Sequence, residues 1–161
     1  MKAKKIALCG LLTAVALVLS YIESLVPLSF AVPGIKMGLP NIAVVFVLYA
    51  VGKREAWLIS LLRVLLVSAL FGNAFSFAYS AVGAMLSLGL MCLLARSGKF
   101  SAVGVSVAGA LAHNFGQILV AVAVLKTPQI AFYLPALCIS AAVTGVCIGL
   151  VAGMLVKRIK V

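Results

Sequence analysis

The chain has very few groups suited to acid–base or metal chemistry. Its 161 residues include no aspartate, two glutamates (Glu23 and Glu55) and one histidine, and charged residues make up only 9% of the total. Soluble proteins carry about 25% charged residues. Without aspartate the chain cannot form the aspartate-rich sites that hold Mg²⁺ and diphosphate, and two distant glutamates replace them poorly.

Apolar residues take the place of the missing charges and make up 66% of the sequence. A soluble domain is about 45–50% apolar. A fold of this size cannot bury the excess, and the exposed remainder would aggregate in water. We therefore expect lipid to be the solvent of this chain. The composition excludes an ordinary soluble enzyme, a nucleic-acid-binding domain and a disordered segment.

The cysteines offer no recognisable metal motif. Four of them stand in apolar runs without a CxxC pair, and the single His113 does not complete a Cys/His zinc set. We expect all four to be small buried hydrophobes. They are Cys9, Cys92, Cys138 and Cys147. The sequence therefore predicts no metal site and no cofactor.

The lengths and interruptions of the apolar runs predict six helices. Their expected ranges are Ile6–Ser24, Leu39–Val51, Ala56–Phe71, Ala74–Ala95, Ala102–Leu125 and Ala131–Val156. The second and third are short, since a hydrocarbon core about 30 Å thick needs about 20 residues. Either their ends extend into the loops or neighbouring helices shield them. The predicted fold class is an all-α integral membrane protein, a compact bundle of six transmembrane helices that residues 1–161 form as a single domain.

The basic residues test this count of helices. With six spans, ten of the 13 Lys and Arg residues fall on one side of the membrane. These are Lys2, Lys4, Lys5, Lys53, Arg54, Arg96, Lys99, Lys157, Arg158 and Lys160. Because basic residues concentrate on the cytoplasmic side, we expect a multi-pass protein of the cell membrane with both termini in the cytoplasm. Basic flanks also favour anionic lipid in the surrounding bilayer.

The longest predicted connection is Leu25–Gly38 on the extracytoplasmic side. It carries Pro27 and Pro33 among mainly apolar residues. Proline stiffens a segment and removes a backbone donor. We expect this loop to fold over the bundle as a cap rather than extend into water.

Small residues recur at four-residue spacing in three of the predicted helices. They are Gly104, Ala108, Ala112 and Gly116 in the fifth, Ala141, Gly145, Gly149 and Gly153 in the sixth, and two such pairs at and just before the first, Ala3 with Ala7 and Gly10 with Ala14. Such stripes let helix backbones approach closely in lipid. For the fifth and sixth helices we favour packing inside the bundle. For the first helix, contact with another protein is an equal alternative.

Polar residues within the spans are functional candidates, because lipid disfavours them. Arg63 lies about 10 Å into the third predicted helix, where it either binds a ligand or extends its side chain to the interface. His113 and Gln117 share a helix face, with Asn114 beside them; hydrogen-bonded packing is the alternative role. Further polar groups near the outer ends of the helices complete the candidate pocket. Its residues are Lys36, Asn41, Arg63, Asn73, Tyr79, Ser80, His113, Asn114 and Gln117. The serines of the fourth helix at positions 76, 80 and 87 are more typical of contacts between helices.

Two segments carry a resemblance to a known family. They are PLSFAVPGIKMGLPNIAVVFVLY at Pro27–Tyr49 and AHNFGQ at Ala112–Gln117, with Arg63 between them. With its basic start and small-residue first helix, the whole chain resembles the Gx transporter family, whose members are often labelled heptaprenyl diphosphate synthase component I. PGIKMGLPN, at Pro33–Asn41, is its most specific stretch. The chain is more distantly similar to the S components of energy-coupling-factor transporters.

The resemblance implies a mechanism. An S component is a membrane-embedded protein that binds a vitamin or other small nutrient and docks on a transmembrane coupling subunit through small residues of its first helix. Two cytoplasmic ATPases drive the cycle. By analogy, the docking face here would be Ala3, Ala7, Gly10 and Ala14, with Gly10 and Ala14 as a looser variant of the typical AxxxA motif. No Walker motif is present, so a partner would have to hydrolyse ATP.

Three functions follow as hypotheses. The first is an S-component-like substrate-binding subunit for uptake of a small anionic, isoprenoid or vitamin-like molecule, energised by partner ATPases. The second is a non-catalytic membrane accessory subunit of polyprenyl diphosphate or quinone-related synthesis. The third is a stand-alone oligomer that associates through the glycine stripe of the sixth helix. An enzyme in its own right ranks last, because no nucleophile–base pair or metal set is visible.

Overall fold

A computed structural model describes residues 2–25 and 37–159 of the chain. These residues form six α-helices and one 3₁₀ helix, with no strand among them. The elements are α1 (Lys2–Leu25), α2 (Asn41–Ala50), α3 (Lys53–Phe71), α4 (Ala74–Ser97), α5 (Ala102–Leu125), η2 (Pro128–Tyr133) and α6 (Leu134–Arg158). The predicted all-α helical class is confirmed. The predicted capping loop lies almost entirely outside the described residues.

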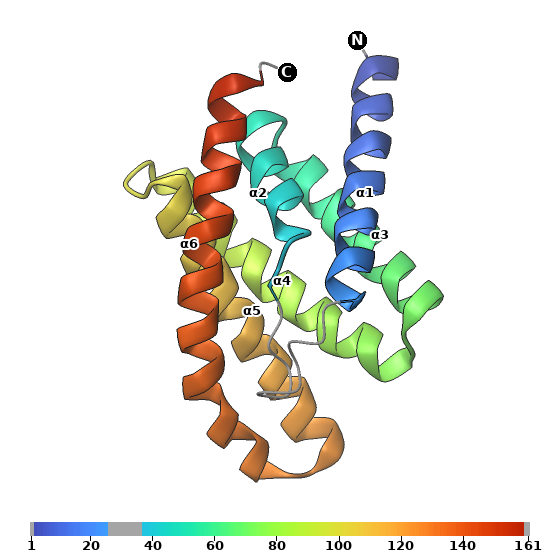
Figure 1. Cartoon of the computed structure of the whole chain (residues 1–161), viewed down its shortest axis with the longest axis vertical. Coiled ribbons are helices and arrows are strands. Elements are labelled where there is room, and N and C mark those ends of the chain that lie inside the picture. Colours follow the sequence, from blue (N-terminus) through green and yellow to red (C-terminus); the bar gives the residue numbers. More distant parts are fainter. Residues whose placement is uncertain (1, 26–36, 160–161) are drawn as a thin grey trace.

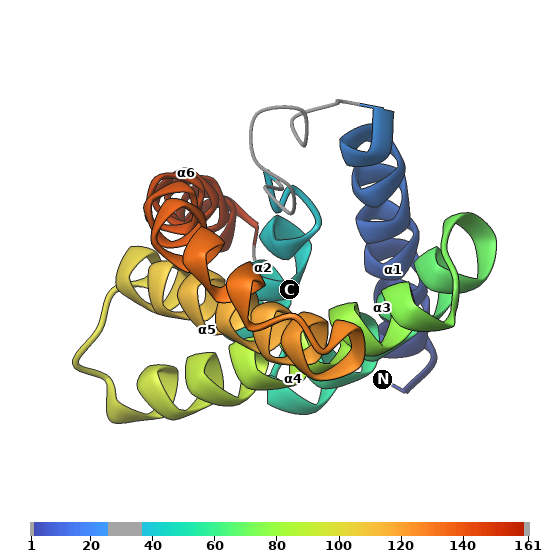
Figure 2. The same ribbon diagram turned by 90° about the horizontal axis from the view of Figure 1, so that it is seen from below.

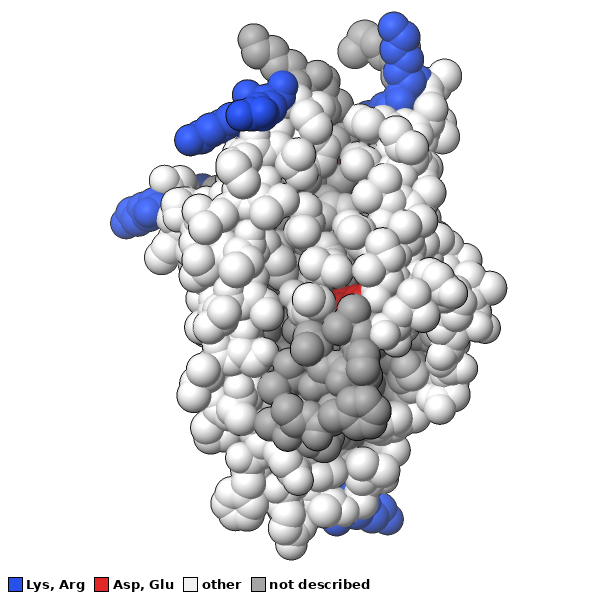
Figure 3. Space-filling view, in the orientation of Figure 1, with Lys and Arg blue, Asp and Glu red and all other residues white. Residues whose placement is uncertain are grey.

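Four of the helices are long and apolar enough to cross a membrane. These segments are Ala3–Leu25, Ala74–Ser97, Ala102–Leu125 and Pro128–Arg158. The two described ends of the chain lie at the same end of the bundle, and the turn between α5 and α6 lies at the opposite end (Figure 1). On the face in Figure 3, Lys and Arg lie towards the two ends, with a broad and mostly uncharged band between them. The chain is therefore a multi-pass membrane protein.

The largest departures from the predicted helix boundaries are at three helix starts, and the first is that of α1, which begins at Lys2 rather than at Ile6. Helix α3 begins at Lys53 rather than at Ala56, after Gly52 with its positive φ of 146°. The charged residues before Ala56 therefore form its first turn, where Glu55 suits the positive end of the helix dipole. The last helix is preceded by the 3₁₀ turn η2 and becomes α-helical only at Leu134, because proline is favoured within the first turn of a helix. The predicted bounds of α5 are confirmed.

The short helix α2 is shielded by its neighbours. Five consecutive residues, at positions 44–48, lie in the buried core together with residues of α3, α4, α5 and α6. Seen from below, α2 stands between α1 and α6 (Figure 2). A ten-residue helix is too short to cross a bilayer. Because neighbouring helices surround α2, it does not need to cross the bilayer by itself. This is the second of the two predicted alternatives, shielding by neighbouring helices.

Small residues bring α4, α5 and α6 into close contact. A Cβ atom added to Gly149 would lie 2.5 Å from the Cα of Val103, and one added to Gly145 would lie 2.8 Å from the Cα of Val107. Between α4 and α5, a Cβ at Gly116 would lie 3.0 Å from the Cα of Gly83. Helices can approach this closely only where no side chain intervenes. The predicted internal packing is confirmed for the small-residue stripe of α6, and in the stripe of α5 it is Gly116 that makes the close contact, with α4.

Candidate functional site

A polar junction joins the C-terminal part of α1 to the residues before α2. One carboxylate oxygen of Glu23 accepts a hydrogen bond from the Gly38 amide at 2.6 Å. Gly38 has a φ of 71°, which glycine adopts without strain. Its carbonyl accepts a hydrogen bond from the backbone amide of Asn41 at 2.8 Å. Glu23 thus holds the backbone turn that positions Asn41 at the start of α2.

Arg63 lies beside this junction. It is ten residues beyond Lys53, so it sits about 15 Å along α3, deeper than the predicted helix start implies. Its Nε atom is buried and has no hydrogen-bond partner. The carboxylate of Glu23 attracts its guanidinium electrostatically. The carboxylate that holds the turn before Asn41 therefore also attracts the guanidinium of Arg63.

The polar residues of α5 contact two other helices. The side-chain amide of Asn114 donates to the carbonyl of Leu137 in α6 at 2.8 Å. A Cβ added to Gly83 in α4 would lie 3.0 Å from the Cγ of Gln117 and 3.1 Å from the Cε1 of His113. Gln117 is 1% exposed and its Nε2 atom has no hydrogen-bond partner. Asn114 thus has a packing role, whereas Gln117 offers an unused donor.

The remaining predicted pocket residues stand apart from these groups or outside the structure. The side chain of Asn73 accepts from the Ser76 amide at 2.8 Å, so it caps α4. Tyr79 is half-buried, and its ring stacks at 5.9 Å from that of Phe75. Ser80 is half-buried on the same helix. Lys36 lies outside the described residues.

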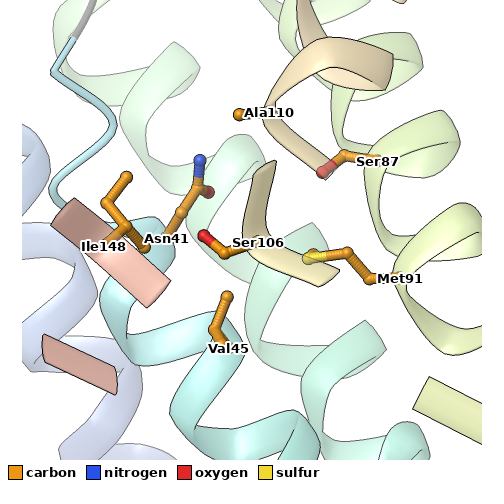
Figure 4. A pocket seen from close by; sticks show the side chains of 7 residues that line it. All are labelled: Asn41, Val45, Ser87, Met91, Ser106, Ala110 and Ile148. Atoms are coloured by element: carbon orange, nitrogen blue, oxygen red, sulfur yellow. The ribbon is translucent and has the colours of Figure 1, made fainter. Parts of the chain in front are cut away.

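A small cavity lies where α2, α4, α5 and α6 meet (Figure 4). Its volume is about 10 Å³, and its lining consists of Asn41, Val45, Ser87, Met91, Ser106, Ala110 and Ile148. The predicted pocket includes Asn41 but neither Ser87 nor Ser106. Ser87 belongs to the serine stripe of α4, for which packing between helices is the predicted role. A lone serine such as Ser106 in an apolar run carries no comparable pattern.

The predicted docking residues of α1 face outwards. Ala3, Ala7, Gly10 and Ala14 are all exposed, and a Cβ at Gly10 would meet no atom within 4 Å. The side of α1 that packs inwards is a different one, with Thr13, Ala16 and Ser20 buried. The small-residue stripe of α1 therefore makes no close contact with the rest of the described chain.

A second polar link holds the other end of α1. The Nζ atom of Lys5 lies 2.7 Å from a carboxylate oxygen of Glu55, in the charged first turn of α3. The hydrogen bond from Lys5 lowers the pKa of the Glu55 carboxyl below its ordinary value. Among the residues that the structure describes, no group of three His, Cys, Asp or Glu side chains is placed to hold a metal ion.

A comparison with protein families shows the family to which the chain belongs. A family model described as heptaprenyl diphosphate synthase component I matches residues 12–155. The chain belongs to this family. The match covers α2 to α5 completely, α1 from residue 12 onwards and α6 as far as residue 155, and the predicted family resemblance is confirmed. No curated protein and no solved structure matches the chain.

Membership in the heptaprenyl diphosphate synthase component I family, with four long apolar helices, fits a membrane accessory or transporter-like subunit. The name describes one component of a synthase, and it specifies neither a substrate nor a chemical step for this chain.

Proposed function

We propose that this chain is a membrane-embedded, S-component-like binding subunit, with no catalysis of its own, for uptake of a small molecule. The observation that carries the proposal is the presence of unused donors in the interior. The Nε atom of Arg63 and the Nε2 atom of Gln117 are buried without partners. A buried polar group without a partner is costly, and intramembrane polar residues commonly mark substrate sites.

The ligand would meet two kinds of polar group. Arg63 would favour an anionic group, since its guanidinium forms two-pronged hydrogen bonds with carboxylate and phosphate. Asn41, His113 and Gln117 would orient uncharged parts of the molecule. Lys36, Asn73, Asn114, Tyr79 and Ser80 belong to the proposed set on sequence grounds. Apolar helix faces would cover an isoprenoid or vitamin-like body.

Helix α1 would supply the docking surface for a transmembrane coupling subunit. Its exposed small residues support this assignment, because such a stripe permits a close helix–helix contact. Cytoplasmic ATPases bound to that subunit would provide the energy. We propose a six-span arrangement in the cell membrane with both termini in the cytoplasm, where the basic ends of the helices would be favoured.

A second candidate function is favoured by the family description, which names a component of heptaprenyl diphosphate synthase. In that case the chain would be an accessory membrane subunit, and α1 would contact a prenyltransferase. The chain has no aspartate, so the partner would supply the aspartate-rich diphosphate site.

Native mass spectrometry of the protein, purified gently from its host membrane, distinguishes the two functions. The transporter proposal predicts a stoichiometric small-molecule adduct and co-purification of a membrane coupling subunit with ATPases. Arg63→Gln and Gln117→Leu should weaken the adduct, whereas Ser24→Ala, an exposed site on α1, should retain it. A chain without adduct, bound only to a prenyltransferase whose activity it raises, would overturn the proposal in favour of the accessory subunit.

A further inference from the structure

The cavity among α2, α4, α5 and α6 has an unusual lining for the interior of a membrane bundle. Three of its residues are polar but uncharged, and each comes from a different helix: Asn41 from α2, Ser87 from α4 and Ser106 from α5. Ser87 is 5% exposed and Ser106 is 4% exposed. No hydrogen bond joins any of these three side chains to another described residue. Their donors and acceptors are therefore available to an occupant.

The side chains converge on one space. Figure 4 shows the amide of Asn41 beside the hydroxyl of Ser106, with the hydroxyl of Ser87 directed towards them from α4. Gly109 has no side chain that would crowd the lining. A Cβ atom added to it would lie 2.6 Å from the sulfur of Met91 and 3.2 Å from the hydroxyl oxygen of Ser87. The packing thus preserves a polar space rather than filling it.

Size and chemistry limit what this space can hold. Its volume of about 10 Å³ is close to the minimum for one water molecule. A buried water needs two to four polar partners, and hydroxyl and amide groups both donate and accept. No acidic or basic residue lines the cavity, so nothing there compensates a charged occupant. A larger organic group does not fit without moving the helices.

We propose that this cavity binds one water molecule that hydrogen-bonds Asn41, Ser87 and Ser106, and so joins α2 to α4 and α5. The water satisfies three polar groups that lipid and apolar core cannot satisfy. The same residue is fixed through its backbone, because the Glu23 carboxylate accepts from the Gly38 amide and the Gly38 carbonyl accepts from the backbone amide of Asn41. The water would keep the Asn41 side chain oriented in the ligand-free protein. The inference does not depend on the proposed transport function.

Radiolytic labelling with mass spectrometry tests for this water. X-ray radiolysis of a bound water yields a hydroxyl radical that oxidises adjacent side chains, and the thioether of Met91 is an efficient target. Met91 lines the cavity and is 3% exposed. In the purified full chain we expect rapid formation of methionine sulfoxide at Met91 despite this burial.

Variants identify the source of the label. Replacing both hydroxyls in a Ser87→Ala/Ser106→Ala double variant should lower the labelling rate of Met91 severalfold, because the water loses two partners. Ala110→Val, which fills the space and keeps both hydroxyls, should lower it as well, so one variant remains informative if the other does not fold. The control is Ser20→Ala, a buried serine of α1 whose hydroxyl bonds the Ala16 carbonyl. An unlabelled Met91 in the unmodified chain, or equal labelling in the folded cavity variants, would overturn the proposal.

Discussion

Helices α1 and α6 carry similar stripes of small residues but use them differently. In α6, Ala141, Gly145 and Gly149 are buried, and Gly149 stands almost against the α5 backbone. In α1, the whole stripe is exposed, and a Cβ at Gly10 meets open space. Of the most apolar 18 residues in each span, 11% are buried in α1 against 28% in the span that contains α6. The same sequence pattern thus gives internal packing in one helix and a free surface in the other.

The attachment of the two helices differs accordingly. Helix α6 packs extensively on α5 through close backbone contact. Helix α1 is held at its two ends by polar links, Lys5 to Glu55 and Glu23 to the Gly38 amide, with limited packing on α3 between them. A helix attached in this way keeps a face available for a partner. The third hypothesis, an oligomer formed through the α6 glycines, loses its basis because Gly145 and Gly149 are occupied by α5.

The largest effect is expected from Gly149→Ala. Its new methyl group would meet the Val103 Cα, and backbone cannot move aside as a flexible side chain can. We expect the free energy of unfolding to fall by about 3 kcal/mol, at the upper end of the usual cost of overpacking. Denaturant titration in detergent micelles measures this change. An unchanged midpoint would show that α5 and α6 are not in close contact.

The second-largest loss of stability is expected from Glu23→Gln, which tests the polar attachment of α1. The substitution weakens the bond to the Gly38 amide and removes the charge that balances Arg63. Because hydrogen bonds to charged groups contribute about 1.5–3 kcal/mol, we expect a loss of about 2 kcal/mol. In a double-mutant cycle, Arg63→Gln should cost less in the Glu23→Gln background than in the original chain. Strict additivity would show that the two charges do not interact.

Gly10→Ala is the matched counterpart of Gly149→Ala and should have the opposite sign. The added methyl meets nothing within 4 Å, and alanine favours a helix over glycine by about 0.5–1 kcal/mol. We expect a small rise in the thermal midpoint of the isolated chain. A marked fall would mean that this face of α1 is covered within the protein.

The smallest effect concerns the other end of α1. Lys5 lowers the pKa of Glu55, so their pair stabilises the fold above the ordinary carboxyl pKa of 4.5 and loses this effect as the pH falls through the lowered value. Exposed pairs of this kind contribute less than about 1 kcal/mol. Glu55→Gln should therefore lower the thermal midpoint slightly at pH 7. The two proteins should converge at a pH below the lowered value, and a constant difference at every pH would contradict this role.

Much of the fold is predictable from the sequence because apolar runs, glycines and basic flanks carry the information. The bounds of α5 follow from Ser101 before it and Lys126 after it, and the close packing of α6 follows from its glycine spacing. The start of α3 is not predictable in this way. The charged residues at positions 53–55 follow a glycine, a pattern that is typical of a loop. They nevertheless form the first turn of α3, where the negative charge of Glu55 is favoured.

The candidate site is predictable only in part. Arg63 and Gln117 stand out because polar residues are rare in apolar helices, and the structure leaves a nitrogen atom of each without a partner. The convergence of Asn41, Ser87 and Ser106 on one cavity depends on how three helices are rotated against each other. Local spacing does not encode that rotation. Likewise, the contrast between the stripes of α1 and α6 arises from tertiary packing rather than from either sequence alone.

The docking of a coupling subunit on α1, as we propose it, can be tested by cross-linking in the native membrane. A photoreactive residue would replace Gly10, with a control at Val143, which is 62% exposed on α6. We expect a cross-link from position 10 to one integral membrane subunit that co-purifies with ATPases, and no protein cross-link from position 143. A cross-link to a prenyltransferase or to a second copy of the chain, or equal cross-linking from both positions, would show that α1 does not dock a coupling subunit.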